Sequence, residues 1–241
     1  MKVRILGITV DIYSMAETVE KIRDAIEERR LLRVVTANPE MIYASEQDPA
    51  LRQVINSADL VTPDGIGVVW AARRLGTKAR ERVTGIDLMQ AIFPAAAAGK
   101  WRIYFLGGKP GVAELAGRKV SRDYPGINLW TRHGYFSIQE EPEILEEIRR
   151  FKPDVLFVGL GAPRQEFWLA EHPGLARVSI GVGGSFDALA GTVRRAPRQI
   201  QELHLEWLYR LLKEPWRWRR QTVLPRFMVK VLCQKLTSFK G

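Results

Sequence analysis

The chain is 241 residues long, 46% of them hydrophobic, and carries a formal net charge of +10. This size allows one sizeable buried core with a small appendage, and the single cysteine, Cys233, excludes an intramolecular disulfide, which suits a reducing compartment. Because the N-terminus lacks the apolar core of a signal peptide and no run reaches the ~18 apolar residues of a spanning helix, we expect a protein that is neither secreted nor transmembrane.

In chain order, capping residues and hydrophobic periodicity predict helices that alternate with short strands. Ser14 to Glu17 has the pattern of a capping box and begins a helix that runs to about Arg30. Asp48-Pro49 and Thr84 begin two more by the same kind of signal. The other predicted helices are 66–75, 112–122, 143–151 and 164–171, and the predicted strands are 33–36, 60–61, 102–106, 127–130, 155–158 and 178–182.

This alternation of strands and helices predicts βαβ units. We therefore expect an α/β, Rossmann-like fold, with a mostly parallel sheet that is covered by helices on both faces. A basic helical appendage follows at the C-terminus. The predicted domains are residues 1–195, the α/β catalytic domain, and residues 196–241, the appendage.

Two polar turns follow β-branched runs and are predicted to lie together at the carboxyl edge of the sheet, where such folds bind ligands. They are Thr36–Glu40 and Val61–Val68. In the second turn, Pro63 fixes φ and Gly65 permits a positive φ, so that Asp64 is held at the start of the next helix. Its carboxylate can cap that helix or take part in chemistry, and both interpretations stay open at this point.

Three glycine-rich segments also follow predicted strands: 107–111, 159–166 and 181–187. A strand, a glycine turn and a helix start can bring backbone N–H groups to a phosphate, although such loops need glycine merely to turn. The segments lack the Gly-Lys-Ser/Thr ending of a P-loop and the spaced third glycine of a dinucleotide fingerprint. The three histidines are far apart, so no metal site is expected, and no Gly-x-Ser-x-Gly elbow occurs.

Five motifs, in order along the chain, resemble those of the TagA/WecG/CpsF family of bacterial glycosyltransferases. They are Thr36-Ala37-Asn38-Pro39-Glu40, Pro63-Asp64-Gly65-Ile66-Gly67, Glu81-Arg82-Val83-Thr84-Gly85, Gly159-Leu160-Gly161-Ala162-Pro163-Arg164-Gln165-Glu166 and Gly181-Val182-Gly183-Gly184-Ser185-Phe186-Asp187. The likeness extends into 190–197 and 205–210, and so covers nearly the whole chain.

The resemblance implies an inverting, metal-independent transferase without a cofactor. It would move N-acetylmannosamine from UDP-ManNAc to GlcNAc on undecaprenyl diphosphate, as in wall teichoic acid linkage-unit synthesis, at the inner face of the cell membrane. Another UDP-sugar, UDP-ManNAc-uronate or UDP-glucose, is the alternative within the family. The implied partners are a UDP-sugar donor, a polyprenyl-diphosphate-linked acceptor and an anionic membrane surface, with no nucleic acid, and a homo-oligomer stays open.

The resemblance also implies roles for particular residues. Asp64 matches the base that takes the acceptor proton, Thr36 and Asn38 match residues beside it, and Arg82 matches a cation for the diphosphate. Without the family, a solvated ion pair with Glu81 or another surface acid would account for Arg82. The implied substrate-binding residues are Gly107, Gly108, Gly161, Arg164, Gln165, Gly183, Gly184, Ser185 and Asp187, with Arg194, Arg195, Arg210 and Arg217 as candidates for closing over the acceptor diphosphate.

The segment 194–241 holds nearly all the excess charge, with 12 lysines and arginines against three acidic residues. Its apolar positions predict short amphipathic helices that break near Pro215 and Pro225. Tryptophans beside arginines suit a membrane interface, whereas a terminal helix packed on the core is the plainer alternative. Two other classes remain: a basic nucleic-acid-binding module and, by analogy of fold alone, a nucleotide-dependent oxidoreductase.

Overall fold

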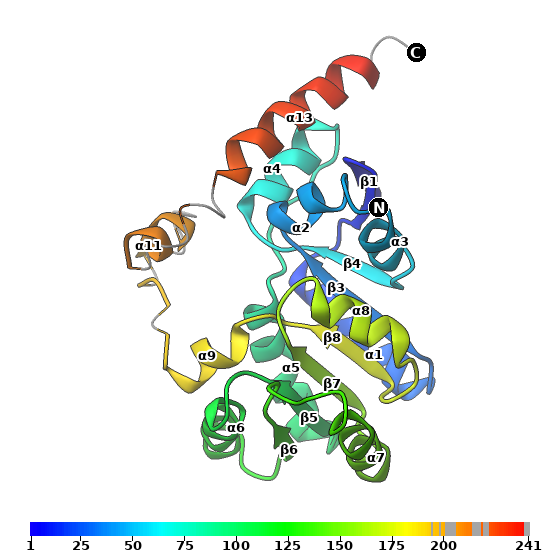
Figure 1. Ribbon diagram of the computed structural model, residues 1–241, viewed down its shortest axis with the longest axis vertical. Helices are drawn as coiled ribbons and strands as arrows, with labels where there is room; N and C mark the ends of the chain where they lie inside the picture. The colour runs from blue at the N-terminus through cyan, green and yellow to red at the C-terminus, as the bar shows by residue number, and fades with distance from the viewer. Residues whose placement is uncertain (194, 198, 201–205, 214–217, 219–221, 239–241) are drawn as a thin grey trace.

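A six-stranded parallel sheet forms the centre of the computed structural model, with the strand order β4-β3-β8-β7-β5-β6 (Figure 1). The structure describes residues 1–193, 195–197, 199–200, 206–213, 218 and 222–238, without the side chains of 206, 210, 213 and 238. The strands are β3 (Leu32–Ala37), β4 (Leu60–Pro63), β5 (Arg102–Gly107), β6 (Asn128–Arg132), β7 (Val155–Gly159) and β8 (Val178–Gly181). The predicted α/β fold is confirmed.

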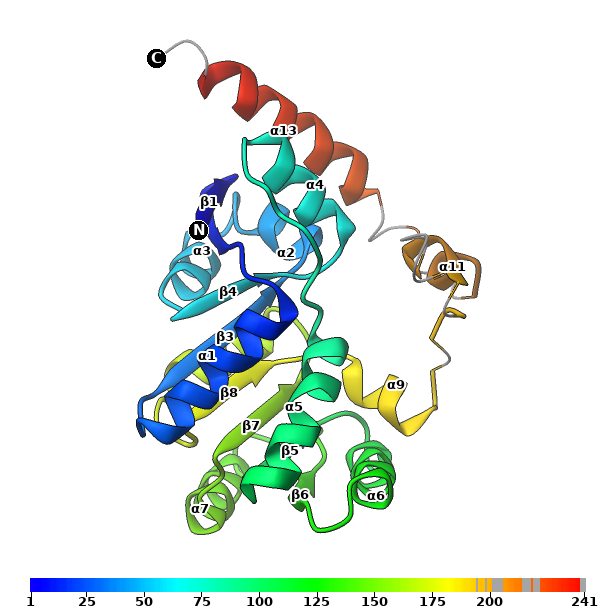
Figure 2. The ribbon, with the colours of Figure 1, turned by 180° about the vertical axis from the view of Figure 1, so that it is seen from behind.

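Helices cover both faces of the sheet because alternate strand residues point to opposite sides. Figure 2 shows α1 and α5 on one face, and α6 and α9 belong to the same apolar cluster, around Phe93, Phe105 and Phe186. The opposite face carries α7 and α8, which bury Ile148 and Trp168. The bounds are α1 (Met15–Glu27), α5 (Gly85–Gly99), α6 (Val112–Asp123), α7 (Glu141–Phe151), α8 (Arg164–Glu171) and α9 (Ser185–Ala190).

A third cluster lies at the β4 edge of the sheet. It contains α2 (Pro39–Ala44), α3 (Pro49–Asn56), α4 (Ile66–Arg74) and the antiparallel pair β1 (Lys2–Ile5) and β2 (Ile8–Asp11). The pair turns through Leu6 and Gly7, both with positive φ, which is the conformation of a tight hairpin. The sequence analysis predicted neither this hairpin nor the six-residue helices α2 and α9, and α1 ends at Glu27 rather than near Arg30.

Capping explains where the predicted helices begin. The Ser14 hydroxyl accepts the N–H of Glu17 at 3.1 Å while the Glu17 carboxylate accepts the N–H of Ser14 at 2.7 Å, which is the predicted capping box. Asp48 caps α3, with proline as the next residue, and Thr84 caps α5. These side chains accept backbone N–H groups that the first helical turn cannot pair.

The C-terminal helix α13 (Val223–Ser238) packs on α2 and α4 (Figure 1). Phe227 and Val231 are fully buried there, and the Gln234 amide bonds to the hairpin, accepting the N–H of Leu6 and donating to the carbonyl of Arg4. The predicted break at Pro225 is wrong, because a proline in the first turn costs a helix no hydrogen bond. The predicted break at Pro215 lies outside the described residues.

The opposite face of α13 is apolar and exposed, through Met228, Val229, Leu232 and Leu236. Helix α11 (Glu206–Lys213) also leaves Leu212 exposed, and Trp218 is exposed between the two helices. No helix within the described ranges is both long and apolar enough to cross a bilayer. The boundary between domains at residue 195 stays a prediction.

The two faces of α13 lead to a stability test at neighbouring positions. Phe227→Ala removes a fully buried ring and should lower the free energy of unfolding by about 3–5 kcal/mol. Met228→Ala, the matched control on the exposed face, should change it by no more than about 0.5 kcal/mol. Chemical denaturation of the full chain measures both. Equal effects of the two substitutions would contradict the docking of α13.

Candidate active site at the carboxyl edge of the sheet

The loops that follow β5 and β7 diverge at the carboxyl edge of the sheet. The first leads to α6 on one face and the second to α8 on the other, which is the topological arrangement that opens a crevice in α/β sheets. The two loops begin in close contact: a Cβ on Gly107 would lie 2.5 Å from the carbonyl oxygen of Gly159. Glycine is therefore required at position 107 by the approach of the neighbouring backbone.

The two polar turns meet at this edge, as predicted. Ala37 and Pro63 are register partners at the ends of β3 and β4, and the Asp64 N–H donates to the carbonyl of Ala37 at 2.9 Å. A Cβ on Gly67 would lie 2.8 Å from the Pro39 ring, so the turn after β3 packs on the first turn of α4.

Asp64 is not the N-cap of the helix that follows it. Helix α4 begins at Ile66, its cap residue is Gly65 with φ +100°, and no side chain among the described residues caps it. Asn38, by contrast, caps α2 through its Oδ1, which accepts the N–H of Met41 at 2.9 Å. The capping interpretation of Asp64 is therefore wrong, and a chemical role for its half-buried carboxyl stays a prediction.

The segment that carries Arg82 runs beside the Asp64 turn. The Val83 N–H donates to the Pro63 carbonyl at 2.9 Å, and Thr62 Oγ1 donates to the Val83 carbonyl at 3.2 Å. These bonds place half-buried Arg82 near the end of β4. Glu81, the alternative partner considered for Arg82, accepts the N–H of Met15 at the start of α1.

The loop between β8 and α9 is held by three side chains for which the resemblance implied other roles, Thr36 beside the base and Gln165 and Ser185 at the substrate. Thr36 Oγ1 donates to the carbonyl of Gly181 at 2.9 Å, and Ser185 Oγ donates to the carbonyl of Val182 at 2.6 Å. Gln165 Oε1 accepts the N–H of Gly183 at 3.0 Å. All three side chains are buried, and their direct contact with a substrate stays a prediction.

Open space remains in front of two of the glycine loops. Gly161 (φ +81°) and Gly183 (φ +54°) both adopt left-handed conformations, and a Cβ on either would meet no atom of the described residues within 4 Å. Arg164, at the start of α8, is exposed and lies over the ring of Phe136 at 5.0 Å. A ligand at this edge can therefore approach the backbone of both loops.

The structure gives contacts for some of the remaining predicted residues and does not describe the others. Arg195 Nη1 lies 2.8 Å from Asp87 Oδ1, so its charge is neutralised at the start of α5. The Asp187 carbonyl accepts the Thr192 hydroxyl at 3.0 Å. Arg194 and Arg217 lie outside the described residues, as does the side chain of Arg210, so their predicted contact with a diphosphate stays untested.

The sequence analysis did not single out Glu166. This residue is 2% exposed, and burial raises the pKa of its carboxyl, an effect that the hydrogen bond from Gln165 partly opposes. An acidic residue in the first turn of a helix is an ordinary start signal, so the pattern did not show that the side chain points inward.

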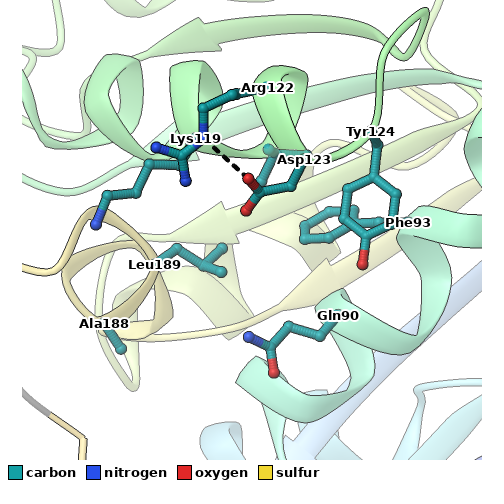
Figure 3. A pocket seen from close by; sticks show the side chains of 9 residues that line it. Gln90, Phe93, Lys119, Arg122, Asp123, Tyr124, Ala188 and Leu189 are labelled. Carbon is teal, nitrogen blue, oxygen red and sulfur yellow. Dashed lines mark hydrogen bonds and ion pairs between the residues drawn. The ribbon is translucent and has the colours of Figure 1, made fainter.

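Two hollows lie among the helices that cover the sheet. The larger, about 500 Å³, lies between α5, α6 and α9, and Figure 3 shows Gln90, Lys119 and Tyr124 around it. It contains none of the predicted site residues. The smaller, about 370 Å³, is lined by Arg164 and Phe136 together with residues of α7 and α8. Within the described part of the chain, no three His, Cys, Asp or Glu side chains come together as metal ligands would.

Comparison with known proteins now identifies the class. The model of the Glycosyl transferase WecG/TagA/CpsF family matches residues 3–241. The chain therefore belongs to this family of glycosyltransferases, as the resemblance implied.

Among its relatives is an N-acetylglucosaminyldiphosphoundecaprenol N-acetyl-beta-D-mannosaminyltransferase of Bacillus spizizenii, 39% identical over 86% of this chain and 81% of the relative. Proteins of the same name from Staphylococcus aureus strains MW2 and MRSA252 are each 36% identical over 95% of this chain and 92% of their own length.

The close contact at Gly107 leads to a second stability test. Gly107→Ala should destabilise the protein by about 1–3 kcal/mol more than Gly161→Ala, because only the first Cβ meets a neighbouring backbone. Both substitutions place alanine at a positive φ, +153° at position 107 and +81° at position 161, so the difference reports the clash together with the more strained backbone at position 107. Denaturation of the two variants measures it. An equal loss in both would show that the β5 and β7 loops are not in contact.

Proposed function

We propose that this protein transfers N-acetylmannosamine from UDP-ManNAc to the GlcNAc of undecaprenyl-diphosphate-linked GlcNAc, with inversion and without a metal ion, as in the synthesis of the teichoic acid linkage unit. The observation that carries the proposal is the similarity to mannosaminyltransferases over 92% of their length. The arrangement of Asp64, Arg82 and the glycine loops along one sheet edge supports it.

In the proposed reaction, an acceptor hydroxyl attacks the anomeric carbon of the donor sugar in a single displacement. A bond forms between the hydroxyl oxygen and this carbon, while the bond to the UDP oxygen breaks and UDP leaves with the electron pair. Asp64 takes the hydroxyl proton. The hydrogen bond from the Asp64 N–H to the Ala37 carbonyl fixes the backbone of Asp64 at the carboxyl edge of the sheet, which supports this role.

The leaving diphosphate develops negative charge that the protein must stabilise. Arg82, placed near the end of β4, can meet it with a bidentate guanidinium. The open backbone of Gly161 and Gly183 allows the diphosphate to approach the sheet edge closely. We propose that these groups, with basic residues of 194–217, supply the charge stabilisation that a metal ion supplies in other transferases.

The base is tested by one isosteric substitution. Asp64→Asn keeps the size and most of the polarity of the side chain but cannot take a proton, so UDP release should fall by roughly 10²–10⁴-fold with little change in melting temperature. Asp123→Asn, at an exposed aspartate of α6, is the matched control and should retain turnover. Near-normal turnover of the Asp64 variant would remove this residue from the mechanism.

We also propose that the protein binds the inner face of the cell membrane through the exposed face of α13. The lipid-linked acceptor places the reaction at a membrane surface. Met228, Val229, Leu232 and Leu236 form an apolar stripe opposite the docked face of the helix, and the surrounding segment is basic. An apolar stripe with flanking cations suits insertion at the level of anionic headgroups.

Liposome binding by the full chain tests this face without removing α13, whose buried side the core needs. Leu232→Asp with Leu236→Asp should weaken binding to vesicles containing phosphatidylglycerol by about tenfold or more. Cys233→Asp with Thr237→Asp adds the same charge at exposed positions one residue further along the helix, off the stripe, and should weaken binding less. The stripe has no membrane role if the two pairs behave alike or if the wild-type protein ignores the vesicles.

A further inference from the structure

A buried chain of hydrogen bonds joins the start of α8 to the loop after β8. The Gly183 N–H donates to Gln165 Oε1 at 3.0 Å, and Gln165 Nε2 donates to Glu166 Oε1 at 2.8 Å. Gln165 and Glu166 are each 2% exposed. A Cβ on Gly181 would lie 2.9 Å from Gln165 Nε2 and 3.3 Å from Glu166 Oε1, so the β8 backbone packs directly on this pair.

The partners of the Gln165 amide determine which way it points. A backbone N–H can only donate, so the amide atom that faces Gly183 must be the oxygen. The NH₂ group then faces Glu166, where only an acceptor satisfies it. Glu166 thus selects one of the two orientations of the amide, and the other would turn NH₂ toward the N–H of Gly183.

Burial of the Glu166 carboxyl group costs free energy, and the need to fill space in the core does not explain why a carboxyl group is there. Its Oε2 is buried without a hydrogen-bond partner among the described residues. Burying a carboxyl group in this way is unfavourable, whereas an apolar side chain of the same length would fill the space more cheaply. The hydrogen bond from Gln165 is an interaction between neighbouring side chains that an apolar residue at position 166 could not replace.

We propose that Glu166 is a positioning residue for glycosyl transfer, which orients the Gln165 amide and thereby holds the Gly183–Gly184 turn in the form that receives the donor diphosphate. This inference rests on the proposed function, in which that turn contacts the donor. The turn lies at the carboxyl edge, and no atom of the described part of the chain lies within 4 Å of a Cβ on Gly183. Neither Glu166 nor Gln165 needs to touch the substrate.

Two substitutions at position 166 distinguish the effect of the hydrogen-bond acceptor from the effect of side-chain size. Glu166→Met keeps the length and removes the acceptor, whereas Glu166→Gln keeps an acceptor oxygen without a charge. Hydrogen exchange at the Gly183 amide, measured by NMR on the ligand-free full chain, requires no substrate. We expect the methionine variant to exchange about tenfold faster than wild type and the glutamine variant to lie closer to wild type. Glu171→Met, at an exposed glutamate of the same helix, is the control.

Turnover provides a second measurement. The methionine variant should raise the KM for the sugar-nucleotide donor by about tenfold, because the turn is no longer held for binding, and the glutamine variant should recover most of this loss. A melting temperature within a few degrees of wild type shows that the fold is intact. A purely structural role would lower the melting temperature of both variants and leave the KM unchanged.

A swap of the two side chains tests the orientation even if the methionine variant does not fold. Gln165→Glu alone sets two carboxyl groups against each other, whereas Gln165→Glu with Glu166→Gln restores an acceptor toward Gly183 and a donor between the pair. The double variant should protect the Gly183 amide better than the single one. Equal exchange in both, or in all variants at position 166, overturns the proposal. If the exchange pattern holds but wild-type protein transfers no sugar, the proposed function fails and the orienting role of Glu166 stands.

Discussion

The insertion of β8 between β3 and β7 makes a single sheet from two separate parts of the chain. Ile180 is the register partner of Val34 on one side and of Phe157 on the other. Because all pairs in this sheet are parallel, the Asp64 turn and the glycine loops end at one edge, although the loops lie between 43 and 123 residues after Asp64 in the sequence. The Thr36 hydroxyl also donates to the carbonyl of Gly181 and so links β3 to β8 by a side chain. The position of the site therefore depends on the pairing of β3 with β8.

At this edge of the sheet, the glycine backbone is exposed to a ligand, and buried side chains hold the loops in place. The close approach of β5 and β7 requires glycine at position 107, and the open conformation at Gly183 exposes backbone to a ligand. Buried polar side chains, above all Gln165 and Glu166, hold the loop between β8 and α9 from the interior of the protein. Asp64 and Arg82, for which we propose proton transfer and charge stabilisation, come from turns that share hydrogen bonds at the end of β4. Preorganisation of this kind lowers the cost of binding a diphosphate.

Much of the fold was predictable because its signals are local. Ser14 and Thr84 cap the helices that they were expected to cap, and the alternation of strands and helices gave the parallel sheet. The missed elements are too short to show a period: α2 and α9 have six residues each, and the hairpin strands have four. Family motifs predicted candidate site residues, but not that Thr36, Gln165 and Ser185 would be buried, because burial depends on contacts with β8 that are distant in sequence.

The central claim is that this chain transfers N-acetylmannosamine in one displacement without a metal ion. Its most direct test is a transfer assay in excess EDTA, with UDP-ManNAc and a GlcNAc-diphosphate-lipid acceptor, in which UDP release and the anomeric configuration of the product are measured together. We expect stoichiometric UDP release and a product of inverted configuration, with UDP-glucose and UDP-ManNAc-uronate far poorer donors. Activity that requires an added divalent cation, retention of configuration, or a preference for another UDP-sugar would contradict it.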